Sequence, residues 1–169
     1  MEYLRIPRFF ITFASELIKY KYMNIKKQIY QGLFGNEIEF LLYDDVEIET
    51  QDNYVSKAYV RFENKNYPDY LEYVFGKDKK YFYFNSFTTN ISYRNKGYGR
   101  SLLKNVRKYY EDCYKGNCVL YLAVGEFGEG ERLNDEQLVE FYSSEGFKII
   151  EHTEFTDPFY GHVVMAIEL

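Results

Sequence analysis

The sequence of 169 residues is poor in the residue types that carry disulfide, metal or low-complexity structure. It has no tryptophan, 3 prolines, 2 cysteines, 2 histidines and 11 glycines. Two cysteines, Cys113 and Cys118, are too few for a disulfide-stabilised secreted scaffold, and their spacing is not that of a zinc-binding pair. We therefore expect two reduced thiols and no metal site. So little proline and glycine also excludes a collagen-like chain.

Long apolar runs and an excess of positive charge are missing as well. The longest uncharged apolar stretch near the N-terminus, Phe9 to Ala14, is far shorter than the roughly 20 residues that cross a bilayer, and no signal-peptide cleavage site follows it. We expect a cytoplasmic protein that binds no membrane. The formal charge is −5, whereas nucleic-acid binders normally have a basic surface, so no nucleic-acid partner is expected. An acidic balance slightly favours a cationic substrate.

Aromatic residues are abundant, with 20 Tyr and 15 Phe. This composition suits β-strands, and the 46% apolar content is sufficient for the core of one domain. Alternation predicts strands around Ile38–Leu42 and Ala58–Phe62. Two aromatic runs, Tyr70–Phe75 and Lys80–Thr89, read as strands joined by a hairpin at 76–79.

The first 36 residues are harder to interpret. Glu2–Ile6 fits a short strand that ends at Pro7. From Phe9 to residue 33 the apolar positions follow the helical period, which predicts one long helix or two helices broken near residues 21–24. Gly32 and Gly35 are plausible stop signals.

The last third has a clearer pattern. Apolar residues from Tyr98 to Cys113 lie on one helical face, Val119–Val124 reads as a buried strand, and Asp135–Glu145 reads as a second helix ended by Gly146. Two closing strands are expected at 147–151 and 162–169. Asp44–Asp45 and Asp157–Pro158 are the expected turns.

The most informative segment is the turn from Arg94 to Arg100, between the strand ending at Thr89 and the following helix. Such a turn presents unpaired backbone N–H groups at the positive end of a helix dipole, which favours an anion. Gly97 and Gly99 would allow a close backbone approach. Lys96 and Arg100 add positive charge.

The glycine turn is weak evidence by itself. A third glycine and a following acidic residue, which a dinucleotide-binding fingerprint needs, are missing, and no Gly-Lys-Ser/Thr sequence completes a P-loop. A helix start with two glycines for packing explains the turn equally well.

Three parts in order are more specific. Arg94-x-x-Gly97-x-Gly99 at a strand-to-helix junction, the apolar strand Val119–Val124, and Tyr142-x-x-x-Gly146-Phe147 together resemble the GNAT superfamily of N-acetyltransferases. The resemblance covers residues 80–169, and residues 1–79 are compatible with it. It implies an α+β fold with a mixed, mainly antiparallel sheet of six to seven strands and about four flanking helices.

The resemblance also implies acetyl-CoA as co-substrate. Backbone N–H groups of the turn would bind its pyrophosphate, and the strand Phe82–Thr89, splayed from the next strand, would pair with its pantetheine arm. The implied binding residues are Phe87, Thr88, Thr89, Arg94, Asn95, Lys96, Gly97, Tyr98, Gly99 and Arg100.

Two residues are candidates for catalysis. Tyr142 occupies the family's general-acid position, where its phenol would protonate the departing thiolate. The strand before the turn carries Asn85 and no carboxylate, so Glu126, in an acidic loop after Val124, is our candidate for the general base; a solvated surface residue is its alternative. Neither histidine is assigned, and neither cysteine stands at a motif position, so no covalent cysteine route is needed.

The expected activity is direct acetyl transfer, in a ternary complex, to a primary amine. The acceptor stays open among a protein N-terminus or lysine, a polyamine, an aminoglycoside-type antibiotic and another small amine. We expect one domain over 1–169, with helices and strands in 1–79 and the acetyl-CoA-binding and catalytic core in 80–169. The family also allows a homodimer. The alternative is a non-catalytic GNAT-like module that binds acyl-CoA or a protein partner.

Overall fold

A computed structural model describes residues 24–32, 35–43, 54–63, 65–125, 133–152 and 162–169. Within these ranges the chain forms one seven-stranded sheet in the order β1-β2-β3-β4-β5-β7-β6. It also forms three α-helices and one short 3-10 helix. The expected mixed α+β fold is confirmed. No helix in the described ranges is long and apolar enough to cross a membrane.

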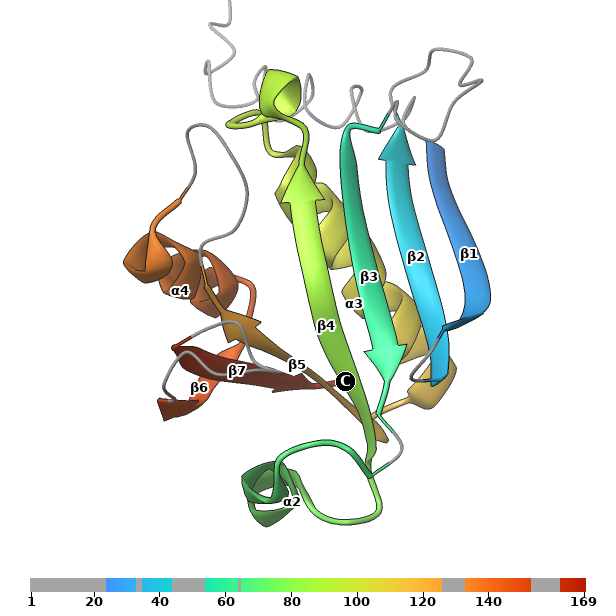
Figure 1. Ribbon diagram of the computed structural model, residues 1–169, viewed down its shortest axis with the longest axis vertical. Coiled ribbons are helices and arrows are strands. Elements are labelled where there is room, and N and C mark those ends of the chain that lie inside the picture. The colour runs from blue at the N-terminus through green and yellow to red at the C-terminus, as the bar shows by residue number, and fades with distance from the viewer. Residues whose placement is uncertain (1–23, 33–34, 44–53, 64, 126–132, 153–161) are drawn as a thin grey trace, which may run out of the picture.

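The first four strands form an antiparallel meander (Figure 1). They are β1 (Asn24–Gly32), β2 (Gly35–Tyr43), β3 (Ser56–Phe62) and β4 (Lys80–Thr89). The other three strands are β5 (Cys118–Val124), β6 (Lys148–His152) and β7 (Val163–Glu168), and β7 pairs antiparallel with both β5 and β6. The two groups meet where β4 pairs with β5 in parallel.

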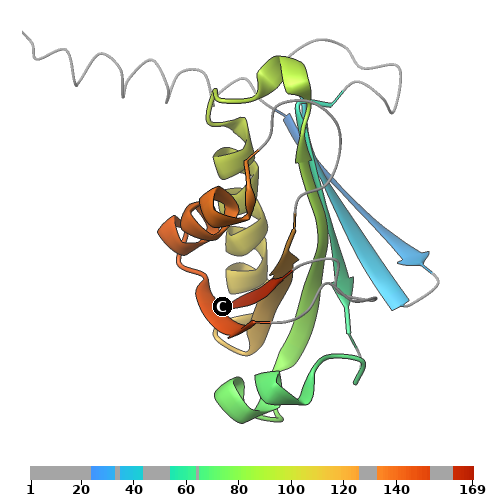
Figure 2. The ribbon, with the colours of Figure 1, turned by 60° about the vertical axis from the view of Figure 1, so that its left-hand side comes forward.

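Helices α3 (Tyr98–Tyr114) and α4 (Asp135–Ser144) lie on the same face of the sheet (Figure 2). The main core forms under them, because the apolar sides of β2, β3 and β4 meet the face of α3 predicted from its period. A smaller cluster on the opposite face contains Leu71 of helix α2 (Asp69–Phe75) together with Tyr81, Tyr83 and Tyr121.

The prediction of a helix through residues 24–32 is wrong, because this segment is strand β1. Its apolar residues Ile25 and Ile29 are four positions apart, a spacing that fits one face of a helix and one face of a strand equally well. The strand is favoured because every residue from Asn24 to Gly32 pairs with β2, ending on the pair Gly32–Gly35. The two glycines flank a hairpin rather than stop a helix.

The predicted strand at Tyr70–Phe75 is also wrong, and so is the hairpin at 76–79. The segment forms helix α2, with Pro68 at its N-cap and two acidic residues, Asp69 and Glu72, in its first turn. Gly76 ends the helix at φ 96°, and its N–H donates to the Glu72 carbonyl at 2.8 Å. Proline followed by an acidic first turn is a helix-start signal, and the aromatic composition masked it.

The remaining elements match their predictions within a few residues. The strands around Ile38 and Ala58, the strand from Lys80, the helix from Tyr98, the strand from Val119, the helix from Asp135 and both closing strands are all present. Glu2–Ile6, the helix expected from Phe9 to residue 23, and the turns at Asp44–Asp45 and Asp157–Pro158 lie outside the described residues.

Candidate functional site

The candidate site begins where β4 and β5 stop pairing. Their parallel ladder runs from Lys80–Cys118 to Tyr83–Tyr121, where the two tyrosine rings lie 5.2 Å apart. Beyond that pair β4 continues to Thr89 beside β3, while β5 continues to Val124 beside β7. The two strands diverge from this point, as Figure 1 shows.

Beyond Tyr83, none of the described strands pairs with the edge of β4 that faces away from β3. The Asn90 N–H donates to the Val55 carbonyl at 2.9 Å, and the Ser56 hydroxyl donates to the Thr88 carbonyl at 2.9 Å, so Thr88 and Asn90 direct these groups toward β3. Since backbone groups of successive strand residues point to opposite edges, Phe87 and Thr89 direct theirs toward the gap. Of the predicted strand residues Phe87, Thr88 and Thr89, Thr88 therefore has its carbonyl directed toward β3 and away from the gap.

The turn that follows β4 opens the N-terminus of α3 toward the same gap. Asn95 and Gly97 have φ of 58° and 82°, and Gly97 is the N-cap without any side-chain cap. The Ser101 N–H donates to the Gly97 carbonyl at 3.0 Å, so the N–H groups of Tyr98, Gly99 and Arg100 have no helical acceptor. These are backbone positions for which the sequence predicts anion binding.

Gly99 has a packing role in this structure. A Cβ atom at Gly99 would lie 3.0 Å from Thr89 Oγ1 and 3.3 Å from the Phe87 ring. The residue therefore lets the first turn of α3 rest directly against the end of β4. Arg94 adds a second tie, because its Nε donates to the Thr89 carbonyl at 3.1 Å.

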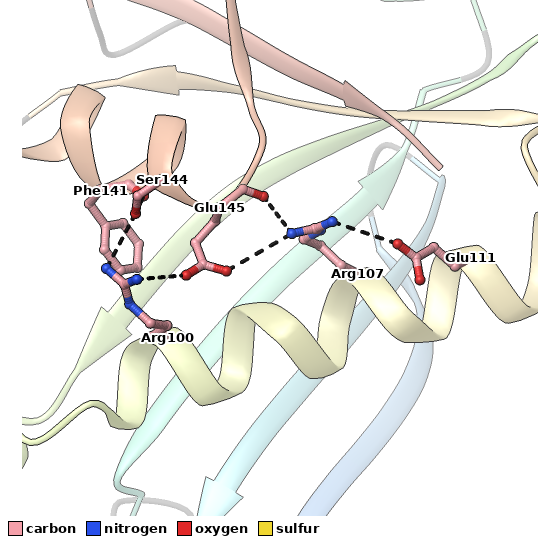
Figure 3. A network of polar contacts seen from close by, with 6 residues as sticks. All are labelled: Arg100, Arg107, Glu111, Phe141, Ser144 and Glu145. Atoms are coloured by element: carbon pink, nitrogen blue, oxygen red, sulfur yellow. Dashed lines mark hydrogen bonds and ion pairs between the residues drawn. The ribbon is translucent and has the colours of Figure 1, made fainter. Parts of the chain in front are cut away.

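Lys96 and Arg100, the other two of the three cations of the turn, are also directed to protein groups. Lys96 Nζ donates to the Ser92 carbonyl at 2.9 Å. The Arg100 guanidinium lies over Phe141, pairs with Glu145 Oε1 at 3.0 Å and approaches Ser144 Oγ at 3.3 Å (Figure 3). The positive charge expected to face a phosphate is thus shared with α4.

Glu145 is the centre of this polar network between α3 and α4. Its side chain is only 4% exposed, and a buried carboxylate needs charged or hydrogen-bonding partners. Arg107 supplies the second contact, donating to the Glu145 carbonyl at 2.5 Å and lying 3.9 Å from Oε2. Arg107 also approaches Glu111 at 3.7 Å. The network joins the start of α3 to the end of α4, and sequence analysis missed it because glutamate after a helix is usually exposed.

Tyr142 lies on the side of the gap formed by α4. It is 7% exposed, and its ring centroid lies 6.5 Å from that of Phe87 and 5.6 Å from that of Phe147. Burial raises the pKa of the Tyr142 hydroxyl above its ordinary value of 10.0, so the group is protonated at neutral pH and can donate. The fold thus brings the candidate acid next to the predicted strand residue Phe87.

The remaining residues weighed in the sequence analysis are Glu126, the two histidines and the two cysteines. Glu126 lies outside the described residues. His152 and His162 are exposed. Both cysteines are free, as expected, and burial raises the pKa of the Cys118 thiol to about 12. Across the described ranges, no group of three or more His, Cys, Asp or Glu side chains could hold a metal ion.

No protein-family model matches the sequence, and the search of curated proteins also gave no match. Solved structures do match. NAA60 from Arabidopsis thaliana, in complex with a bisubstrate analogue, is 12% identical with a TM-score of 0.57, and the match covers 79% of this chain and 76% of that one. The NatC complex bound to Gag peptide and CoA is 11% identical, with a TM-score of 0.52 over 78% of this chain and 70% of that one.

A third match extends over more of this chain. Elp3 from the archaeon Methanocaldococcus infernus is 15% identical with a TM-score of 0.56, and the match covers 89% of this chain but 30% of that chain. Identities at this level show a shared fold. The fold of this chain is that of the GNAT acyl-CoA N-acyltransferases.

Proposed function

We propose that this chain transfers the acetyl group of acetyl-CoA to a primary amine by direct attack in a ternary complex. The observation that carries the proposal is the edge of β4 after Tyr83 that no described strand pairs with. This edge adjoins the uncapped start of α3 and the buried Tyr142. A strand edge accepts an extended amide chain, and an uncapped helix start accepts a phosphate.

The residues present fit such a ligand. Phe87 and Thr89 would supply backbone groups to the amides of the pantetheine arm. Tyr98, Gly99 and Arg100 would supply N–H groups to the pyrophosphate. Two complexes with the same fold support this assignment, since NAA60 has been solved with acetyl-CoA and the NatC complex with CoA.

The proposed chemistry forms one bond and breaks one bond. The deprotonated amine nitrogen attacks the thioester carbonyl carbon, a C–N bond forms, and the C–S bond breaks. Tyr142 donates its proton to the departing thiolate, and the proton lost by the nitrogen passes to a base and then to solvent. Glu126 is our candidate for that base.

Thermal unfolding with and without acetyl-CoA tests the binding step. At a hundredfold excess over Kd, linkage predicts about 2.7 kcal/mol of stabilisation, or roughly 5 to 10 °C for a domain of this size. Free adenine nucleotide is the control, and its shift should be smaller. An unchanged melting temperature with acetyl-CoA would rule out the site.

Release of free CoA thiol in the presence of mixed amines tests the transfer step. Amine-dependent release supports the enzyme. Stabilisation by acetyl-CoA without any release would instead support the non-catalytic acyl-CoA-binding module.

A further inference from the structure

A cavity of about 340 Å³ opens on the sheet between β2, β3 and β4. Its lining residues are Glu37, Tyr59, Val60, Arg61, Asn85 and Ser86. Val60 belongs to the main core under α3. Because side chains alternate along a strand, Tyr59 and Arg61 project from the opposite face. The cavity therefore lies on the face of the sheet away from α3 and α4.

A bulge in β4 places the cavity beside the gap. Ser86 pairs with Tyr59 and Phe84 pairs with Val60, so Asn85 is an extra residue without a partner on β3. Phe84 and Phe87 both pack toward α3, while Asn85 and Ser86 between them are exposed. The bulge comes directly after Tyr83, the last residue of β4 that pairs with β5.

The acceptor amine has easier access to the gap from the cavity face of the sheet than from the face covered by α3 and α4. On the other face, the gap is lined by the rings of Phe87, Phe141 and Tyr142, with Phe87 stacked on Phe141 at 6.2 Å. On the cavity side, Asn85 and Ser86 are exposed at the same level of β4, so this side is the more open one among the described residues.

The cavity lining holds one carboxylate, Glu37, and one guanidinium, Arg61, and the carboxylates of Glu39 and Glu63 lie beside it. Arg61 is paired with the buried Glu63, its Nε lying 2.5 Å from Oε1. The Tyr59 hydroxyl donates to Glu39 at 2.5 Å. Burial raises the pKa of Glu63, Arg61 opposes that rise, and the charge of Glu37 adds to it. Glu37 has no hydrogen bond or ion pair with another described residue, so it is the available carboxylate of the lining.

A second cation also lies on this face among the described residues. Lys57 pairs with Leu41, four positions along β2 from Glu37, and its Nζ lies 4.4 Å from the centroid of the Tyr54 ring and 5.8 Å from that of the Tyr59 ring. No ion pair joins Lys57 to Glu37 within the described part of the chain.

We propose, on the basis of the function proposed above, that this cavity holds a second cationic group of the acceptor against Glu37. Glu37 pairs with Arg61, and Arg61 pairs with Tyr83 of β4, so Glu37 lies two strands from β4. At strand spacings near 4.8 Å the separation between Glu37 and β4 is about 10 Å, and the gap begins just beyond the far edge of β4. The acceptor class is therefore a long diamine or polyamine, with one amine at the gap and one ammonium at Glu37.

Steady-state thiol release with three matched amines tests this assignment. Diaminooctane has two amines far enough apart, octylamine has the same chain and one amine, and ethylenediamine is too short. We expect kcat/KM for diaminooctane to exceed that for octylamine by about tenfold, the effect of one charge-assisted contact. Equal values for the two long amines would overturn the assignment.

Two substitutions locate the effect. In Glu37→Gln the kcat/KM for diaminooctane should fall to nearly that for octylamine. Glu37→Lys should instead raise kcat/KM for aminooctanoate, whose far end is a carboxylate. Glu140→Gln, on the exposed surface of α4, removes the same charge far from the cavity and should keep the ratio. A ratio that survives Glu37→Gln would contradict the proposal. Stabilisation of each variant by acetyl-CoA shows that it is folded.

Calorimetric titration of the CoA-bound protein with diaminooctane separates this inference from the proposed function. Binding that is about tenfold weaker in Glu37→Gln, without thiol release, would support the cavity and refute the transferase. Thiol release without preference for the diamine would support the transferase and refute the cavity.

Discussion

The two ends of β4 differ in what surrounds them. From Lys80 to Tyr83 the strand has neighbours on both edges, and the residues from Tyr81 to Phe84 are buried. From Asn85 to Thr89 its only neighbour among the described strands is β3, and none of these five residues is fully buried. The difference shows that one strand can be paired on both edges at its beginning (the anchored end) and, among the described strands, on one edge only at its end.

The largest expected effect is on the anchored end. Leu120 pairs with Phe82 and is completely buried, so Leu120→Ala should lower the free energy of unfolding by about 3 kcal/mol through a cavity in the core. Chemical denaturation measures the loss. If the anchored end is purely structural, Kd for acetyl-CoA at low temperature should stay within about twofold of the wild-type value, a difference of under 0.5 kcal/mol. A much weaker Kd would show that the first half of β4 also contributes to acetyl-CoA binding, contrary to the prediction.

The next largest effect is expected at Tyr142, which lies beside the second half of β4. Tyr142→Phe should reduce turnover by roughly a hundredfold, the low end for loss of a general acid, with little change in acetyl-CoA affinity. Tyr110→Phe is the matched control, since that hydroxyl is buried in the core without a hydrogen-bond partner among the described residues. Wild-type turnover in Tyr142→Phe would exclude Tyr142 as the acid.

The sequence predicted the elements around the second half of β4 better than the first strands of the sheet. The helices from Tyr98 and Asp135 have clear helical periods, and Val119–Val124 is a short continuous apolar run. The order of these three elements carried the resemblance. By contrast, the spacing of Ile25 and Ile29 fits two periods, and only pairing with β2 decides between them. Helix α2 was missed because aromatic composition was given more weight than Pro68.

The finer features of the site depend on contacts between distant segments. The bulge at Asn85 exists only relative to the register of β3. The burial of Glu145 depends on its contacts with Arg100 and Arg107. Arg107, the nearer of the two along the chain, is 38 positions from Glu145. No local pattern contains such information.

Alkaline pH should act on the anchored end. Burial raises the pKa of Tyr81 to about 12, and its hydroxyl donates to the Gly76 carbonyl at 2.7 Å. Between pH 10 and 12 the folded state keeps this proton while the unfolded chain has lost it, so the contribution of Tyr81 to the free energy of unfolding falls by about 1.4 kcal/mol per pH unit. Below pH 10 both states are protonated and the contribution is constant.

Denaturation curves between pH 10 and 12 in the wild type and in Tyr81→Phe measure this contribution. The slope should become shallower by one proton in the variant. Identical slopes would mean that Tyr81 titrates normally in the folded protein.

The smallest effect compares the two ends of α3. Gly97 and Gly116 have φ of 82° and 84°, so Gly97→Ala and Gly116→Ala should each cost about 1 kcal/mol of stability through left-handed strain. Only Gly97→Ala should also weaken acetyl-CoA binding, because only that residue precedes the uncapped N–H groups. Equal affinities in the two variants would make the turn merely structural.

The parallel seam between β4 and β5 has a mechanical consequence. Two antiparallel blades, β1 to β4 and β5 to β7, are joined in the described sheet only from Lys80–Cys118 to Tyr83–Tyr121. An extended ligand along Phe87 and Thr89 would lie between β4 and β5 and contact both parts of the sheet. Bound substrate would then reduce the relative motion of the two parts, and release of the product would restore that motion.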